Sequence, residues 1–166
     1  MTAQQQSTRD ERFSHSESIL IDATPDQVWD VVTDVTRTGE WSPICREGWW
    51  KEPATGPEVG AWFHGRNESG DRVWETQSLV TAAEKPTEFT WMVGGAAVRW
   101  SYTLAPEESG TRLTESWQVQ DKGFDFFDKQ YGDNAQTELE IRRDAALSGI
   151  PETLAAIKRI VEAGTR

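Results

Sequence analysis

The sequence has 166 residues, the length of one domain, and a chain of this size buries enough surface to fold without disulfides or a structural metal. Its 28 acidic and 17 basic residues give a net charge of −11, which opposes non-specific binding to nucleic acid or to an anionic membrane. Cys45 is the single cysteine, and the sequence has neither a secretory signal nor a membrane-spanning apolar run. We expect a soluble, cytoplasmic protein, a monomer or weak dimer, without nucleic-acid partner, integral membrane association, metal or cofactor.

The beginning of the chain is polar and then becomes apolar. Residues 1–12 have no apolar anchor and are predicted to form a flexible tail, so that one domain covers residues 13–166. A strand follows over residues 13–21. Thr24, Pro25 and Gln27 then form a capping-box pattern that starts a short helix. Residues 36–43 are expected to form a turn or a second short helix that carries Trp41 inward.

The middle of the chain alternates between apolar and polar residues, with turn signals at hairpin spacing. Six consecutive antiparallel strands are predicted there, and after Gly123 the pattern becomes helical. Ile150, Leu154, Ile157 and Val161 share one face of a long helix over residues 134–163. This order predicts an α+β fold in which a bent seven-stranded antiparallel sheet wraps around the last helix and leaves a ligand site between them. The six strands are expected at residues 44–52, 61–67, 73–82, 88–93, 97–105 and 111–120.

A distinctive segment runs from Ile21 to Asp34 and continues with Glu40-Trp41-Ser-Pro43. This segment resembles the opening of the polyketide cyclase/dehydrase and lipid-transport family of the START-related superfamily, whose fold is called helix-grip and also occurs in birch-pollen allergen. The resemblance implies a helix-grip fold with a ligand cavity. Members of the superfamily bind lipids, sterols or hormones, carry quinones or cyclise polyketides, so the resemblance does not settle the activity. Further matches are Val59-Gly60-Ala-Trp-Phe63, Trp74 to Val80, Lys85 to Trp91, Gly110 to Trp117 and Ala155 to Ile160.

Strand alternation, together with the family pattern for two strands, predicts which side chains face the cavity. The nine tryptophans are more rings than a close-packed core of this size requires, and some are expected to line a pocket. The Gly-flanked stretch 123–132, after the last strand, either gates the cavity or plugs the core, and its aromatic residues are Phe124, Phe126, Phe127 and Tyr131. The predicted ligand-binding residues are Trp50, Phe63, Asn67, Trp74, Thr76, Ser78, Phe89, Trp91, Trp100, Trp117, Phe126 and Phe127.

Three polar residues are the candidates for acid–base chemistry. Glu115 falls on the apolar side of its strand, and an inward carboxyl group would be paired or protonated there. A bulge, or an ion pair with Arg99 or Arg112, would instead give it a structural role. Tyr102 would place a hydroxyl group in the cavity or serve as a core ring. His64 is the only histidine within the predicted sheet but shares parity with Arg66, which favours the outer face.

Three functions remain open from the sequence. The first is a carrier or sensor of a hydrophobic small molecule, and the second is an aromatic polyketide cyclase/dehydratase-type enzyme that uses the same cavity. The third is a partner-binding regulator with Trp62 and Leu79 on the convex face. Phosphate-binding loops, nucleophile elbows and paired metal-binding histidines are absent from the sequence.

Overall fold

The segments in which apolar and polar residues alternate form the strands of the predicted sheet. In the computed structural model, which describes residues 1–165, the seven strands form one antiparallel sheet in the order β1-β7-β6-β5-β4-β3-β2, so that the first strand closes onto the last. The predicted α+β, helix-grip architecture is confirmed. The strands are β1 (Ser14–Ile21), β2 (Cys45–Trp50), β3 (Trp62–Ser69), β4 (Arg72–Glu84), β5 (Glu88–Val93), β6 (Val98–Glu107) and β7 (Gly110–Val119).

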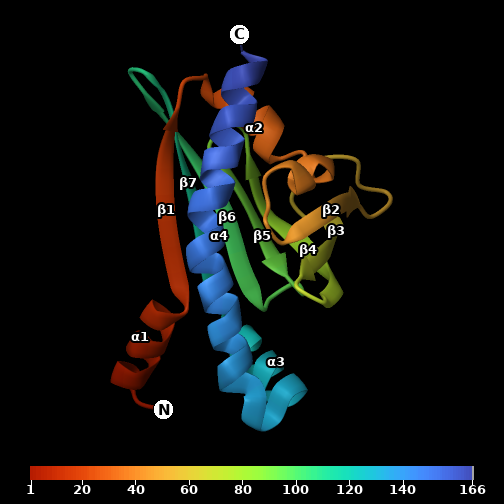
Figure 1. Ribbon diagram of the computed structural model, residues 1–166, viewed down its shortest axis with the longest axis vertical. Coiled ribbons are helices and arrows are strands. Elements are labelled where there is room, and N and C mark those ends of the chain that lie inside the picture. The colour runs from red at the N-terminus through yellow and green to blue at the C-terminus, as the bar shows by residue number, and fades with distance from the viewer. Residues whose placement is uncertain (166) are drawn as a thin grey trace.

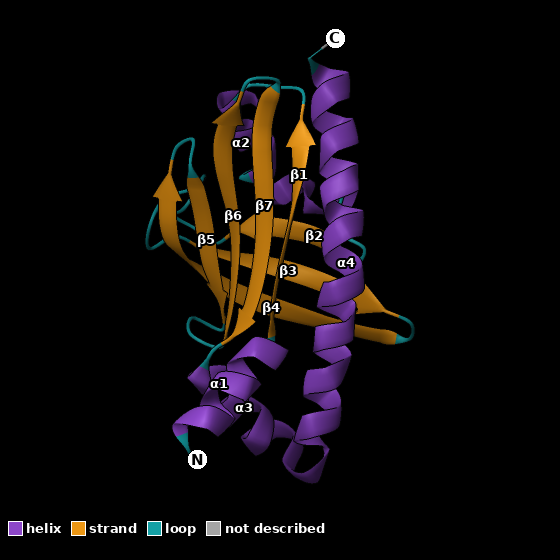
Figure 2. Ribbon diagram, turned by 90° about the vertical axis from the view of Figure 1, so that its left-hand side faces the viewer, coloured by secondary structure: helices purple, strands orange, loops and turns teal. Residues whose placement is uncertain are grey.

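The sheet is strongly bent. Figure 2 shows β1, β5, β6 and β7 running along the long helix, while β2, β3 and β4 cross behind them. Register shifts lie between Cys45 and Glu47 in β2 and between Val80 and Ala82 in β4. Such irregularities bend a strand and increase its twist. The bend gives the sheet a concave inner face and a convex outer face.

The long helix α4 (Ala135–Gly164) lies against the inner face and runs alongside β1 (Figure 1). The predicted stripe is its core side, since Ile150, Leu154, Ile157 and Val161 are all buried. Near its C-terminal end, the Lys158 ammonium group donates to the Leu20 carbonyl oxygen at 2.8 Å. The helix therefore packs mainly on the β1 side of the sheet.

Two short elements follow β1, as predicted: α2 (Pro25–Val32) and the 3-10 helix η1 (Val35–Glu40). Thr24 caps α2 by accepting from the Gln27 backbone, and the Gln27 side chain accepts from the Thr24 backbone. A side chain at Gly48 would put its Cβ atom 2.3 Å from the Val35 carbonyl oxygen, so this glycine lets η1 lie directly on β2. Trp41, just after η1, is buried as predicted.

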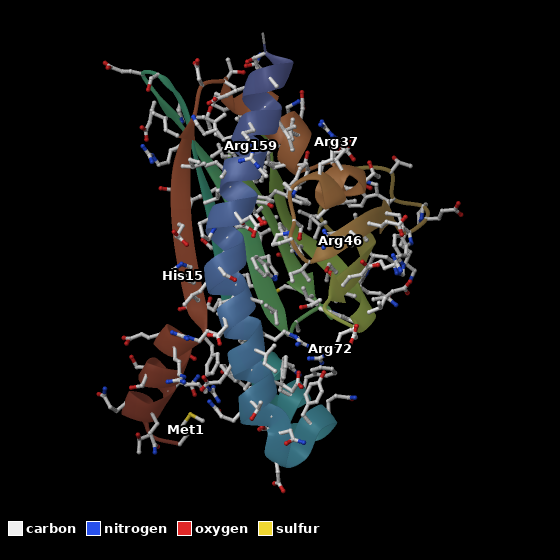
Figure 3. All side chains as sticks on the ribbon, in the orientation of Figure 1. Met1, His15, Arg37, Arg46, Arg72 and Arg159 are labelled. Atoms are coloured by element: carbon white, nitrogen blue, oxygen red, sulfur yellow. The ribbon has the colours of Figure 1, made fainter. Side chains whose placement is uncertain are left out.

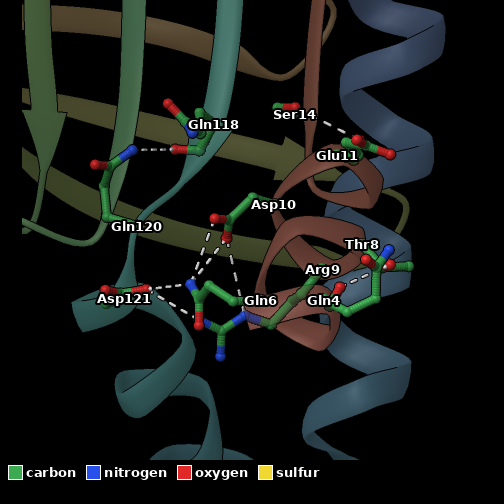
Figure 4. Close-up of polar contacts among 10 residues, drawn as sticks. All are labelled: Gln4, Gln6, Thr8, Arg9, Asp10, Glu11, Ser14, Gln118, Gln120 and Asp121. Atoms are coloured by element: carbon green, nitrogen blue, oxygen red, sulfur yellow. Dashed lines mark hydrogen bonds and ion pairs between the residues drawn. The ribbon is translucent and has the colours of Figure 1, made fainter. Parts of the chain in front are cut away.

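The N-terminal segment differs from the predicted tail, because residues Ala3–Arg12 form helix α1. Thr2 and Gln5 form a capping box at its start. Arg9 pairs with Asp121 at 2.9 Å and lies over the Phe124 ring at 3.9 Å, while Arg12 pairs with Glu140. Figure 4 shows Arg9 and Gln6 bonded to Asp121. None of the α1 residues is buried, so polar contacts with distant parts of the sequence hold the helix, and hydrophobic patterning could not reveal them.

The aromatic stretch after β7 is also helical. It forms α3 (Asp121–Tyr131), which is followed by the short 3-10 helix η2 (Gly132–Asn134) and then by α4. Phe124 and Phe127 are buried, whereas Phe126 is 50% exposed. No helix within residues 1–165 is long and apolar enough to cross a bilayer.

Candidate functional site

Alternate residues of six strands point to the inner face, as the strand parity predicts. The register carries this pattern across the sheet, because Trp50 pairs with Phe63, Phe63 with Ser78, and Trp91 with Trp100. The predicted inward set from the strands therefore lies on one surface. It comprises Trp50, Phe63, Asn67, Trp74, Thr76, Ser78, Phe89, Trp91, Trp100, Tyr102, Glu115 and Trp117.

The inward aromatic rings form a continuous row. Trp91 is its centre, with ring centroids 6.1 Å from Phe63, 5.4 Å from Phe89 and 5.5 Å from Tyr102. Trp91 and Trp100 are stacked with an interplanar angle of 10° and centroids 6.4 Å apart. Phe89 is fully buried, whereas Phe63, Trp91 and Trp100 are only half-buried. Part of this inward aromatic surface thus stays in contact with solvent.

Small polar groups lie on the inner face beside this row. The Asn67 amide nitrogen donates to the Trp74 carbonyl oxygen at 3.4 Å and to the Thr76 hydroxyl oxygen at 3.3 Å. A Cβ atom at Gly65 would stand 3.1 Å from the Thr76 hydroxyl and 3.3 Å from the Cys45 sulfur. Burial raises the pKa of the Cys45 thiol, so this thiol is not an activated nucleophile.

Glu115 lies in the middle of β7 on the inner face, and no bulge turns it outward. It is 5% exposed, and its Oε2 atom has no hydrogen-bond partner among the described residues. Burial, and then the charge of Glu17, raises the pKa of Glu115 to about 8. The carboxyl group is therefore mostly protonated at neutral pH, and neither predicted arginine partner contacts it.

Two residues of β1 that sequence analysis did not select stand beside Glu115. Glu17 pairs with Glu115 across the β1–β7 ladder, and His15, two residues earlier on the same face, contacts the Glu17 carboxylate at 2.8 Å. Figure 3 labels His15 on β1. The signal was present in the sequence, because His15 and Glu17 share parity with the inward Ile19 and Ile21. What the sequence lacked was the register that sets Glu17 opposite Glu115.

Tyr102 is the neighbour of Glu115 on the other side, in β6. It is 4% exposed, and burial, together with the charge of Glu115, raises its pKa well above the usual value. A hydrogen bond from the Trp41 side chain opposes this rise. The tyrosine hydroxyl group therefore already has one protein partner and stays protonated.

Two predicted residues lie apart from this arrangement. His64 is on the outer face, where its ring stacks on Trp49 with centroids 5.2 Å apart. It therefore does not join Glu115 and Tyr102. Phe126 lies on the solvent side of α3 and contacts Phe127 edge to face at 5.7 Å.

Two hollows flank α1, away from the inner face. The first has a volume of about 440 Å³ and the second about 340 Å³, and both are lined mainly by polar side chains of α1. Figure 4 shows the polar contacts of Gln6, Asp10 and Gln118, which border the first hollow. Neither hollow includes any of the inner-face aromatic rings.

The inner face thus combines an apolar aromatic surface with one row of ionisable groups, Glu17, Glu115 and Tyr102. Such a surface can hold a flat apolar molecule by ring contacts. A buried, protonated carboxylic acid can also donate a hydrogen bond or a proton to that molecule.

A comparison with curated proteins finds no match. Among solved structures, the Polyketide_cyc-like protein Cgl2372 of Corynebacterium glutamicum is 49% identical with a TM-score of 0.67, over 92% of this chain and 93% of that one. The di-domain ARO/CYC StfQ of the steffimycin biosynthetic pathway has a TM-score of 0.72 at 12% identity, over 98% of this chain and 55% of that one.

Another solved structure and a family model also match this chain. The di-domain ARO/CYC BexL of the BE-7585A biosynthetic pathway has a TM-score of 0.67 at 19% identity, over 90% of this chain and 50% of that one, so this chain spans about half of either di-domain protein. Both likenesses are at the level of the fold. The model of the family described as polyketide cyclase/dehydrase and lipid transport matches residues 12–150. The chain therefore belongs to the polyketide cyclase/dehydrase and lipid transport family.

Proposed function

We propose that this protein binds or carries a hydrophobic small molecule, a lipid, a polyketide or another aromatic ligand, against the inner face of its sheet. The observation that carries the proposal is the half-burial of Phe63, Trp91 and Trp100, which point inward and form one row. Covering apolar rings that are in contact with water lowers the free energy, so these rings favour the binding of an apolar ligand.

The position of α4 supports this proposal. The helix runs alongside β1, so its buried stripe covers the β1 side of the inner face (Figure 1). The half-buried rings belong to β3, β5 and β6, farther across the sheet. Arg142 of α4 lies over the Trp74 ring at 5.3 Å, so helix and sheet meet again at one end of this surface. A ligand would lie between them, along the ring row.

Two tryptophans allow a matched test of ligand binding. Trp91 lies at the centre of the inner row, whereas Trp49 stacks on His64 on the outer face and is 37% exposed. Titration with fluorene, followed by calorimetry, should give affinity about tenfold weaker for Trp91→Leu and unchanged affinity for Trp49→Leu. Equal effects of the two substitutions, or no binding of fluorene by the unsubstituted protein, would contradict the proposal. Native mass spectrometry of the purified protein would identify a ligand retained from the cell.

A second candidate function is an aromatic polyketide cyclase or dehydratase, and Glu115 is the observation that favours it. Its carboxyl group is buried, is mostly protonated at neutral pH and lies beside the aromatic row, as a general acid requires. The inner face would hold a flexible chain so that its reacting carbons meet.

The enzyme hypothesis is tested with a linear poly-β-ketone thioester, whose cyclised and dehydrated products are followed by mass spectrometry. Glu115→Gln should lower the rate about 100-fold or more while the affinity for fluorene stays unchanged. A rate that equals the rate without protein would exclude this candidate and leave the binding function in place.

A further inference from the structure

Glu115 is a polar side chain of the inner face with a buried oxygen atom that accepts no hydrogen bond from the described residues. Among the described residues, the buried side-chain atoms without a hydrogen-bond partner are Oε2 of Glu115 and Nε of Arg9. The arginine is explained by its neighbours, since its guanidinium group lies over the Phe124 ring and pairs with Asp121. Glu115 has no such explanation. A buried polar atom without a partner lowers stability, so it points to a partner supplied from outside the chain.

Several other polar side chains of the inner face are already engaged. Asn67 bonds to Thr76 and to two backbone carbonyl oxygens, and the Thr111 hydroxyl donates to the Ala23 carbonyl oxygen at 2.8 Å. Tyr102 has its bond with Trp41. Among the described residues, Glu115 therefore carries the buried polar atom of this face that still lacks a partner, and a polar atom of a ligand can supply one.

A ligand on the aromatic row reaches Glu115. Trp100 pairs with Trp117, two residues from Glu115 on β7, so Trp100 and Glu115 are diagonal neighbours on the same face. Diagonal neighbours of an antiparallel pair are about 7–8 Å apart, within the span of two fused rings. Trp100 is half-buried, so a ligand that covers its ring extends toward the carboxyl group.

The charges around Glu115 decide which ligand atom it can take. On β1, Glu17 faces it with a negative charge, which His15 contacts at 2.8 Å. On β6 its neighbour is Tyr102. Of the three arginines of α4, Arg142 pairs with Glu138, Arg143 donates to the Arg12 carbonyl oxygen and Arg159 is exposed to solvent. A ligand carboxylate would meet no free cation here and would be repelled by Glu17.

We propose that the neutral Glu115 carboxyl group donates a hydrogen bond to an uncharged oxygen of the bound molecule, so that the preferred ligands are flat apolar molecules with a carbonyl-type oxygen and not fatty-acid anions or amines. This inference rests on the proposed binding function and names its ligand class. It also makes recognition depend on pH. Burial and Glu17 together raise the pKa of Glu115, and above that pKa the ionised group repels the ligand oxygen.

The test uses probes that share one tricyclic skeleton: fluorene, 9-fluorenone, fluorene-9-carboxylate and a trimethylammonium derivative of fluorene. Their affinities are measured by calorimetry at pH 6.5 and pH 9.5, with circular dichroism to confirm the fold at each pH. At pH 6.5 the unsubstituted protein should bind fluorenone about threefold to tenfold more tightly than fluorene and should bind the carboxylate more weakly than either. At pH 9.5 the preference for fluorenone should be lost, while the affinity for fluorene stays constant.

Three variants separate the hydrogen bond from general packing. Glu115→Gln keeps a donor that does not titrate, so its preference for fluorenone should persist at pH 9.5. Glu115→Leu has no donor and should show no preference at either pH. Glu17→Gln removes the neighbouring charge and lowers the pKa of Glu115, so the preference should disappear at a lower pH than in the unsubstituted protein.

The outcomes distinguish this inference from the function on which it rests. If none of the probes binds, both the binding function and this inference are wrong. If fluorene binds but fluorenone binds no better at pH 6.5, the inference alone fails. Tighter binding of the trimethylammonium probe than of fluorenone, growing with pH, would also overturn it, because it would identify Glu115 as the counter-ion of a cation.

Discussion

Glu17 and Glu115 face each other across the β1–β7 ladder, so the sheet sets a second carboxylate beside one that is already buried. The half-buried Glu17 has His15 as its partner, whereas Oε2 of Glu115 has none among the described residues. Burial and the charge of Glu17 raise the pKa of Glu115, so Glu115 holds its proton at neutral pH.

The raised pKa of Glu115 predicts how the stability of the protein depends on pH. The pKa of Glu115 is about 8 in the folded protein and close to its ordinary value of about 4.3 in the unfolded chain. Between these two values the folded state binds one more proton than the unfolded state, so the free energy of unfolding falls as pH rises. At pH 7 the accumulated loss is about 3.5 kcal/mol.

Glu115→Gln removes this dependence. Relative to the variant, the unsubstituted protein should lose stability between about pH 4.5 and pH 8, and the difference should be constant outside that window. Urea unfolding of both proteins from pH 4 to pH 9 measures the difference. Parallel curves over the whole range would show that Glu115 titrates normally.

The buried stripe of α4 predicts a large effect of one core substitution. Leu154 is 2% exposed, so Leu154→Ala should lower the free energy of unfolding by about 2–5 kcal/mol through the lost apolar contacts and the cavity left behind. Arg159 is exposed on the same helix (Figure 3), and Arg159→Ala should change stability by less than about 0.5 kcal/mol. Thermal and urea unfolding measure the stability of both variants. Equal losses of stability would show that the Leu154 side of α4 does not face the core. Lys158 is not a suitable control, because it bonds to Leu20 and Glu162.

At Gly123, substitution by alanine is expected to lower stability, although helix propensity alone would predict an increase. Alanine normally stabilises a helix relative to glycine, but a Cβ atom here would stand 2.1 Å from the Ala97 carbonyl oxygen. Gly123→Ala should therefore destabilise the protein by about 1–3 kcal/mol, as overpacking does. The matched control is Gly164→Ala at the end of α4, where a Cβ atom would meet nothing within 4 Å. A stabilised Gly123→Ala variant would mean that α3 does not pack on Ala97.

The last prediction concerns helix α3 and tests whether residues 123–132 act as a gate over the inner face. If they do, their amide hydrogen exchange should slow when fluorene binds, because closing over a ligand protects the backbone. The exposed hairpin turn between β3 and β4, at Gly70, provides an internal control that should not change. Unchanged exchange across α3 would leave Phe124 and Phe127 as a fixed part of the core.

The strands and their inner face could be predicted because alternation is a local signal. In β7, for example, Leu113, Trp117 and Val119 fix the parity that turns Glu115 inward. What alternation cannot supply is the register between strands distant in sequence, so Glu17 and His15 were missed although they share parity with Ile19. Helix α1 was missed for a related reason: the partners of Arg9 and Arg12 lie more than a hundred residues away, and no apolar face indicates them.

The attachment of α1 has a consequence for how the molecule responds to ionic strength. Its links to the rest of the protein include the pairs Arg9–Asp121 and Arg12–Glu140, and it buries no residue of its own. Added salt screens exposed charge pairs but leaves apolar packing intact or strengthens it. Rising salt should therefore loosen α1 before it affects the sheet and α4. The N-terminal helix would then be the element whose position reports the salt concentration around the protein.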